Sequence, residues 1–437
     1  EWMVYGEPEQ DVFGMDVARF GLHQSNKEYI RQTTAQFYSN RFVVTYPNEQ
    51  WPAGRRLRTA GAYAEMDAAG ARWGQNWGLE VPLYFAPSPE FEEPGTMRRP
   101  TSFPIVADES FATRDGAGLL DISGFSRYRI SGARTEAWMD KLLACRLPKS
   151  GKVKMAPMLG HDGRLKGDLT CFNWGNDEYW LMGSYYLREF HMRWFNDHME
   201  DNVSVEDISD AYAGFAVAGP NARAILEKVS DTDLSSLKMM NCTSADLGLH
   251  RVRVSRLSLS GEMAYEINCA ANEQAQLRRL LLDAGADLAI KEVGFASMLS
   301  MRLEKGIGIW NAEFTQAYTP AMTGLDRWIA WDKGDFIGKA AAQSAPKPDR
   351  VLTMLEVDAD NADASGFEPV WQGDKLVGMT TSGGFGHRVG KSLALALVDR
   401  ELAEPGNDLA IHVVGENRGA KTIEMSPYDP DGSRMRA

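Results

Sequence analysis

The sequence predicts an α+β protein with several lobes: a small N-terminal domain, a body of two α/β lobes and a terminal β-rich domain. At 437 residues the chain is too long for a single core and suits roughly three domains of about 150 residues each. A unit of strand, glycine turn and helix occurs twice in the middle of the chain, and the last part contains short strands between glycine turns. We therefore place domains at 1–98, 99–345 and 346–437.

In the N-terminal domain, Asn26 to Tyr38 has the pattern of a helix, and an aromatic, glycine-rich stretch runs from Ala60 to Trp77. A segment rich in proline then extends from Ala86 to Pro100 and is predicted to be a linker. This part looks like a small domain that covers another one.

The body contains the two similar units. Residues 128–130 are predicted to form a strand that leads through Gly132 into a helix from Thr135 to Cys145. Residues 215–217 likewise lead through Gly219 and Pro220 into a helix over 222–229. Chance also produces short matches of this kind, but the repetition fits two α/β lobes.

Other elements follow from periodicity. Alternating apolar residues with many aromatics between Gly160 and Asn196 predict antiparallel strands and then a helix. Leucines on one face predict a helix from Asn272 to Leu288. In the terminal domain the predicted strands are Val351–Val357, Lys375–Met379 and Leu393–Val398.

Composition and charge narrow the class of ligand. With 47 Lys and Arg against 60 Asp and Glu, the net charge of −13 disfavours nucleic acid or an anionic membrane as partner. No apolar run approaches the roughly 18 residues needed to span a bilayer. The first ten residues lack the pattern of a signal peptide, and the natural start is expected to be missing. We expect a small-molecule ligand and a cytoplasmic location, or the mitochondrial matrix if the source is eukaryotic.

Metal, disulfide and nucleotide sites are not indicated. The four cysteines are widely spaced without a C-x-x-C motif, so buried reduced thiols and no metal are expected. The glycines at Gly390 and at Gly306 and Gly308 do not complete a phosphate-binding loop or a dinucleotide fingerprint.

Two carboxylates in semi-apolar settings remain as candidates for chemistry. Asp168 follows a glycine turn and precedes Leu169, where it can accept or orient a proton or simply cap backbone amides. Glu266 lies in a strand after a glycine turn, four residues after Glu262, so the two carboxylates are expected on one side of that strand. A strand carboxylate facing a pocket can accept two hydrogen bonds from a planar ring, whereas a solvent-facing pair is the structural alternative.

Several segments, in order along the chain, carry a family resemblance. They are Arg114–Ser123, Asp162–Thr170, Ser260–Ile267, Arg302–Gly306 with Trp310, Trp331–Lys339 and Thr381–Ser392. Together they resemble the glycine-cleavage T-protein (aminomethyltransferase) family, and more closely the carboxy-terminal half of dimethylglycine and sarcosine dehydrogenases. The N-terminal residues, including Gly6-Glu7-Pro8 and Asp16–Phe20, look like the tail of the flavin domain of those dehydrogenases, followed by their small covering domain.

The resemblance implies a multi-lobed T-protein fold with a central folate channel and a terminal β-barrel. It implies tetrahydrofolate as cofactor, with Asp168 as the catalytic group beside folate N10 and Glu266 as the carboxylate that grips the pterin ring. Arg302 matches an arginine near the folate site, and Trp310 belongs to the same matched segment. Leu259 stands where the family usually has tyrosine, which places one ring contact in question.

The implied function is tetrahydrofolate-dependent one-carbon transfer in an N-methyl amine (dimethylglycine- or sarcosine-type) dehydrogenase, with the iminium or formaldehyde unit captured as 5,10-methylenetetrahydrofolate. The chain lacks the flavin-binding fingerprint, so FAD is expected in a domain or subunit that is not present in this chain. The expected partners are folate, a small methylated amine and that flavin-binding oxidase part. Two alternatives stay open: a folate-dependent demethylase of another methylated compound, and a non-catalytic partner of a flavin subunit.

Overall fold

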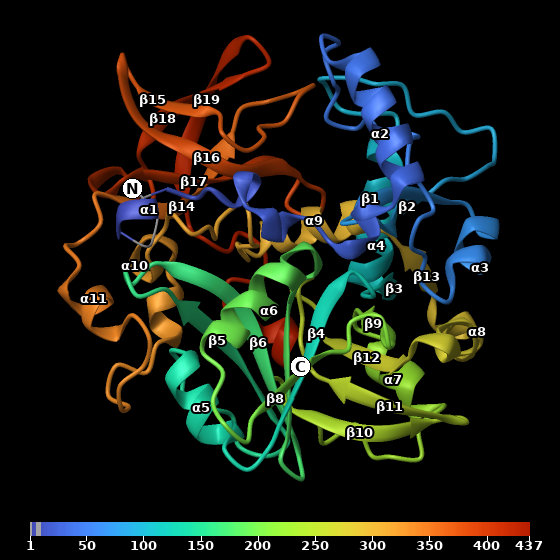
Figure 1. The fold of residues 1–437 in the computed structure, drawn as a ribbon. Coiled ribbons are helices and arrows are strands. Elements are labelled where there is room, and N and C mark those ends of the chain that lie inside the picture. Colours follow the sequence, from blue (N-terminus) through green and yellow to red (C-terminus); the bar gives the residue numbers. More distant parts are fainter. Residues whose placement is uncertain (1, 6–9) are drawn as a thin grey trace.

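A computed structural model describes residues 2–5 and 10–437, and it contains two separate sheets, a closed barrel and an N-terminal hairpin (Figure 1). The predicted α+β, multi-lobed fold class with a terminal barrel is confirmed. Gly6-Glu7-Pro8, part of the predicted flavin-domain tail, lies outside the described residues.

The N-terminal part consists of helices and one hairpin beside the body. Its elements are α1 (Trp2–Tyr5), α2 (Lys27–Asn40), α3 (Tyr63–Ala68), β1 (Ala71–Asn76) and β2 (Leu79–Phe85). The predicted helix over 26–38 corresponds to α2, because the Asn26 side chain accepts hydrogen bonds from the backbone of Glu28 and Tyr29 and so caps its first turn. None of the α2 residues is buried.

The first lobe of the body is a five-stranded antiparallel sheet that packs against two helices. In spatial order it contains β5 (Lys152–Leu159), β6 (Leu165–Gly175), β7 (Glu178–Ser184), β4 (Phe125–Ser131) and β8 (Ser204–Asp207). Its helices are α5 (Thr135–Leu142) and α6 (Arg188–Asp197). Strand β4 and α5 form the first predicted strand–turn–helix unit.

The second lobe is a six-stranded sheet in which β3 and β13 are parallel and the other neighbours are antiparallel. In spatial order it contains β10 (Cys242–Leu247), β11 (His250–Ser255), β12 (Ala264–Ala270), β9 (Tyr212–Ala218), β3 (Ala117–Asp121) and β13 (Ile290–Val293). Its helices are α4 (Phe103–Asp115), α7 (Ala222–Glu227), α8 (Gln274–Gly285) and α9 (Phe295–Glu304). Strand β9 and α7 form the second predicted unit, and α8 occupies the centre of the helix predicted over 272–288.

The C-terminal lobe is a closed barrel whose interior is apolar. Its strands, in spatial order, are β14 (Arg350–Val357), β17 (Lys391–Asp399), β16 (Lys375–Gly386), β15 (Pro369–Gln372), β18 (Asp408–Val413) and β19 (Glu416–Ile423). The short helices α10 (Pro320–Thr323) and α11 (Lys339–Ser344) precede it, and α12 (Ser433–Arg436) follows it. The three strands predicted for this domain lie within β14, β16 and β17.

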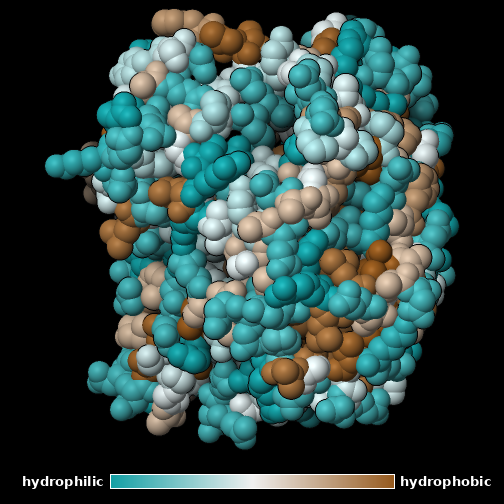
Figure 2. Space-filling model, turned by 90° about the vertical axis from the view of Figure 1, so that its right-hand side faces the viewer, coloured by the Kyte–Doolittle hydropathy of each residue, from teal (hydrophilic) through white to brown (hydrophobic). Residues whose placement is uncertain are grey.

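One face of the molecule is mostly polar. Figure 2 shows the face that carries α2, α3 and α8 as largely hydrophilic, with an apolar area in its lower right part and smaller ones near the top and the left edge. Large apolar side chains in the N-terminal part are nevertheless exposed: Met15, Val17, Leu22, Phe42, Val43 and Val44. Within the described residues, no helix combines the length and apolar character that crossing a membrane requires.

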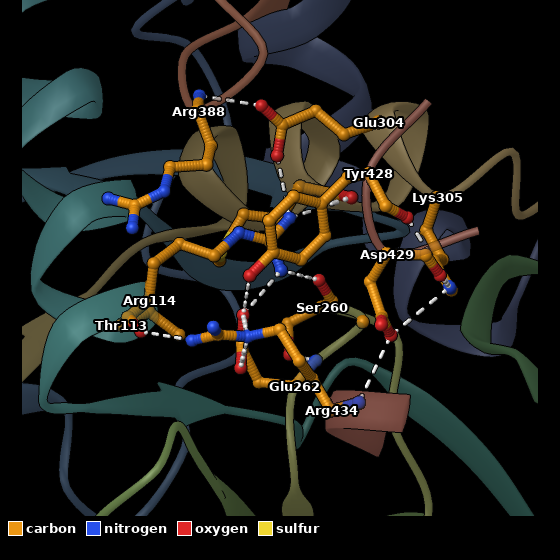
Figure 3. A network of polar contacts seen from close by, with 12 residues as sticks. Thr113, Arg114, Ser260, Glu262, Glu304, Lys305, Arg388, Tyr428, Asp429 and Arg434 are labelled. Atoms are coloured by element: carbon orange, nitrogen blue, oxygen red, sulfur yellow. Dashed lines mark hydrogen bonds and ion pairs between the residues drawn. The ribbon is translucent and has the colours of Figure 1, made fainter. Parts of the chain in front are cut away.

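A buried ion cluster joins the second lobe to the C-terminal segment (Figure 3). Arg114, at the end of α4, is fully buried and pairs with Glu262 at 3.1 Å and with Glu304 at 2.6 Å. Its guanidinium lies 3.7 Å from the ring centroid of Tyr428. Arg434 of α12 adds a second cation, 2.9 Å from Glu262. The prediction that Glu262 and Glu266 share one side of a strand is wrong, because Glu262 precedes β12 and is drawn into this cluster.

The same cluster reaches the barrel. The second carboxylate oxygen of Glu304 accepts hydrogen bonds from the backbone of Arg388 at 2.6 Å and Val389 at 2.9 Å, in the loop between β16 and β17. Lys305 pairs with Asp429 at 3.5 Å and fixes the C-terminal segment a second time. One buried guanidinium therefore connects α4, the turn before β12, α9 and the C-terminal segment.

Replacement of Arg114 by methionine is expected to lower stability by about 3–5 kcal/mol, because two buried carboxylates lose their main cation. Urea unfolding followed by circular dichroism measures the loss. Arg146→Met is the matched control, since its ion pair with Asp332 is exposed and is expected to contribute less than about 1 kcal/mol. Equal losses for the two variants would show that the cluster does not hold the lobes together.

Candidate functional site

A narrow, mostly apolar pocket lies against the sheet of the second lobe and contains Glu266. Its apolar walls are formed by Leu120, Ile122, Leu257, Leu259, Val293, Met298 and Met301. Among the described residues that line it, Glu266 is the one that carries a charge. The pocket therefore offers a flat apolar surface and a single anionic acceptor.

The sheet itself keeps this space open. Glu266 lies in β12 opposite Ala216 of β9, and Ala264 lies opposite Ala218, so these side chains share one face of the sheet. Together with Gly118 of β3, these small residues line the pocket beside Glu266. Small side chains beside the large acidic one leave a narrow space of about 30 Å³.

Burial changes the acidity of Glu266. Desolvation raises the pKa of this carboxyl to about 7, and the positive charge of Arg127 opposes the increase in part. No described group donates a hydrogen bond to it. Such an unpaired, poorly solvated carboxylate is expected to gain strongly from a ligand that brings N–H donors.

Asp168 lies in the other lobe, in β6 opposite Pro157 of β5. Its Oδ1 atom is buried without a hydrogen-bond partner among the described residues, and burial raises the pKa of this carboxyl to about 6. The buried hydroxyl of Tyr186 also lacks such a partner, and burial and then the charge of Asp168 raise the pKa of that phenol. The aspartate is therefore ionised above pH 6 and has a free acceptor atom.

The other predicted site residues occupy different surroundings. Leu259 lines the Glu266 pocket, and Trp310 packs in the apolar cluster that includes Leu165 and Tyr186. Arg302 is buried in α9, 3.0 Å from Glu313, and desolvation lowers the pKa of its guanidinium. The structure thus brings Leu259 together with Glu266 in one pocket. Trp310 belongs to the same apolar cluster as Tyr186, whose pKa responds to the charge of Asp168. Arg302 belongs to a separate ion pair.

That ion pair attaches α9 to the barrel. Glu313 also accepts hydrogen bonds from Thr381 at 2.7 Å and Ser382 at 2.5 Å, both in β16. These contacts satisfy one side of the Arg302 guanidinium, whereas its Nε atom is buried without a hydrogen-bond partner among the described residues, so the folate role of Arg302 stays a prediction.

Sequence reasoning missed two buried polar side chains near Glu266. Asn268 follows it by two residues in β12, and Arg127 reaches Asn268 from β4 of the other lobe. The spacing of two in a strand could have indicated Asn268, but no local signal indicates Arg127.

The two carboxylates are expected to reduce stability at high pH. A carboxyl whose pKa is higher in the folded than in the unfolded state favours folding when protonated, so this contribution is lost as the pH rises from about 4.5 to 7 for Glu266 and from about 4 to 6 for Asp168. At pH 8, Glu266→Gln and Asp168→Asn should each unfold at higher temperature, with gains of about 1–3 kcal/mol.

Thermal unfolding at pH 8 and pH 4 measures this difference, with the exposed Glu401→Gln and Asp374→Asn as controls. The gain should vanish at pH 4, where the wild-type carboxyls are protonated. Lower stability of both variants at pH 8 would contradict the assigned environments.

Comparisons with known proteins fit this architecture. Residues 62–333 match the model of the GCVT N-terminal domain, and residues 350–429 match the glycine cleavage T-protein C-terminal barrel domain. Residues 5–60 match the FAD dependent oxidoreductase central domain. The crystal structure of glycine cleavage system aminomethyltransferase T from Bartonella henselae superposes with a TM-score of 0.75 at 20% identity, covering 85% of this chain and 98% of that one.

Curated relatives include mitochondrial dimethylglycine dehydrogenase of Mus musculus, 29% identical over 97% of this chain and 50% of the relative. The 4-methylaminobutanoate oxidase (formaldehyde-forming) of Paenarthrobacter nicotinovorans is 27% identical over 100% of this chain and 54% of its own length. Aminomethyltransferase of Halothermothrix orenii is 28% identical over 72% of this chain and 89% of its own. The chain thus spans about half the length of the two oxidative relatives.

Proposed function

The chain belongs to the glycine cleavage T-protein family, and from this we propose that it is the tetrahydrofolate-dependent one-carbon transfer part of an N-methyl amine demethylase. In this role it captures the carbon of an iminium, or free formaldehyde, as 5,10-methylenetetrahydrofolate. The substrate class we favour is a dimethylglycine- or sarcosine-type amine, in keeping with the relatives named for dimethylglycine and 4-methylaminobutanoate.

One observation carries the proposal: an unpaired carboxylate, Glu266, in an otherwise apolar pocket. The pterin ring of tetrahydrofolate is flat and presents adjacent N–H donors along one edge. A carboxylate can accept two of these in parallel, and apolar walls suit the faces of a ring. Because the space measures about 30 Å³, the proposal requires the walls to move apart when the ring enters.

Asp168 supplies the proton acceptor in this proposal. N5 and N10 of tetrahydrofolate each form a C–N bond to the one-carbon unit. The bond from that carbon to the donor amine breaks and the amine leaves with the N5 proton, or water leaves when formaldehyde is the donor. The proton of N10 is released as the bridge closes. The unpaired Oδ1 of Asp168 orients N10 and accepts this proton. A pKa of about 6 keeps the carboxylate ionised at neutral pH yet basic enough to act.

The oxidation that creates the iminium is assigned to a flavin-binding part outside this chain, where FAD accepts the hydride. The match of residues 5–60 to an FAD dependent oxidoreductase domain supports such a partner. The exposed apolar side chains between Met15 and Val44 provide a surface for contact with it. In a eukaryotic source, the mitochondrial relatives favour the matrix as location.

Two rivals remain. The first is a folate-dependent demethylase of another methylated compound on the same scaffold. The second is a non-catalytic partner, favoured by the similarity to the mitochondrial pyruvate dehydrogenase phosphatase regulatory subunit of Mus musculus, 24% identical over 98% of this chain and 51% of the relative. Catalysis by the chain distinguishes this second rival from the proposal.

Glu266→Gln is expected to weaken tetrahydrofolate binding by about 1.5–3 kcal/mol, or roughly 10–150-fold, because an ionised acceptor becomes a neutral amide. Isothermal titration calorimetry at pH 8 measures the affinity, with Glu401→Gln as control. Wild-type binding should also weaken as the pH falls below 7, since Glu266 becomes protonated, and the variant should lose this dependence. Equal affinities for variant and wild type would reject the pterin-binding role.

Asp168→Asn is expected to slow methylene formation by about 10²–10⁴ while folate still binds, because the amide keeps the shape but does not accept the proton. The assay supplies formaldehyde as donor and measures 5,10-methylenetetrahydrofolate, with Asp374→Asn as control. A variant that retains the wild-type rate would make Asp168 a structural residue and favour the non-catalytic alternative.

A further inference from the structure

A buried amide lies beside Glu266 and is not explained by the fold. Asn268 is fully buried and follows Glu266 by two residues in β12, so its side chain lies on the same face of the sheet. Arg127 of β4 donates a hydrogen bond from Nε to the Oδ1 atom of Asn268 at 2.7 Å. On this face of β12, the carboxylate of Glu266 is thus followed by the amide of Asn268.

The contact with Arg127 fixes which way the amide points. A guanidinium has only donors, so the Asn268 atom that faces it must be the oxygen. The Nδ2 group is therefore directed elsewhere, and it is buried without a hydrogen-bond partner among the described residues. A buried amide donor without an acceptor is unfavourable, so a ligand that brings an acceptor to this group would remove that cost.

Arg127 itself is held in place. It is buried and donates to the backbone oxygens of Phe125 at 2.8 Å and Ile122 at 2.9 Å. Ile122 also lines the pocket. Because these bonds anchor the guanidinium, Arg127 acts as a positioning residue that keeps the Asn268 donor oriented.

We propose that Asn268 is a specificity residue of the Glu266 pocket, whose Nδ2 group donates to a ring carbonyl next to the N–H groups that Glu266 accepts. This inference rests on the proposed function and deepens it. The pocket then selects a ring edge with two donors followed by an acceptor, as in a 2-amino-4-oxo ring. A 4-amino ring places a donor opposite the Asn268 donor and is disfavoured.

The test compares folic acid with aminopterin, which differ in the 4-oxo and 4-amino groups. Titration calorimetry at pH 8 gives the ratio of their dissociation constants, and the wild type should prefer folic acid. Asn268→Asp keeps an oxygen toward Arg127, so it is expected to fold, but it replaces the free donor with an acceptor. The preference for folic acid, measured as the ratio of the two dissociation constants, should fall by at least about tenfold. The loss of one hydrogen bond can produce a change of this size.

Two further variants separate the possible results. Asn221→Asp is the matched control: the Nδ2 group of Asn221 already donates to the backbone oxygen of Leu288, so this variant should leave the ratio unchanged. Glu266→Gln should weaken the binding of folic acid itself, and this loss reports on the role of Glu266 in holding the ring. Wild-type binding of folic acid with an unchanged ratio in Asn268→Asp would overturn the specificity role alone. Failure of the wild type to bind folic acid would overturn this inference, and failure to bind tetrahydrofolate as well would overturn the proposed function.

Discussion

The pocket depends on the buried guanidinium of Arg114. Besides its two carboxylates, it donates hydrogen bonds to the backbone oxygens of Ser260 and Met301, and both residues line the pocket. Its neighbour Thr113 lines the pocket as well. The charge cluster that joins the second lobe, the barrel loop and the C-terminal segment therefore also determines the spacing of the pocket walls (Figure 3). Stability and the shape of the pocket therefore depend on the same group.

The acids of the candidate site are buried without ion-pair partners, unlike those around Arg114. At Arg114 charges of both signs are buried together, whereas Glu266 and Asp168 are buried without an ion-pair partner, and burial raises both pKa values. Unpaired buried carboxylates reduce the stability of the protein alone, and a ligand with complementary donors removes this penalty. Glu109 and Asp121 also have pKa values raised by burial, but both accept hydrogen bonds from neighbouring groups. The lack of such donors at Glu266 and at Oδ1 of Asp168 is therefore what supports the proposed binding role of these two acids.

Local sequence signals predicted much of the fold. The strand–turn–helix units appear as β4 with α5 and β9 with α7, because glycine turns and apolar periodicity act over a few residues. Glu262 was misplaced since its partner Arg114 is distant in sequence, and the ion cluster holds its side chain in the turn before β12. The role of Arg302 at the folate site stays a prediction from resemblance, and its contact with Glu313 is visible only in three dimensions. Arg127 was missed for the same reason, since it meets Asn268 across two sheets, whereas the spacing within β12 could have indicated Asn268.

The central claim is that this chain holds a folate between the two carboxylates. A crystal structure of the chain with bound tetrahydrofolate tests it most directly. The account predicts that the pterin edge contacts Glu266 and that N10 lies within hydrogen-bond reach of Asp168. Folate bound elsewhere, or no ligand at saturating concentration, would contradict it.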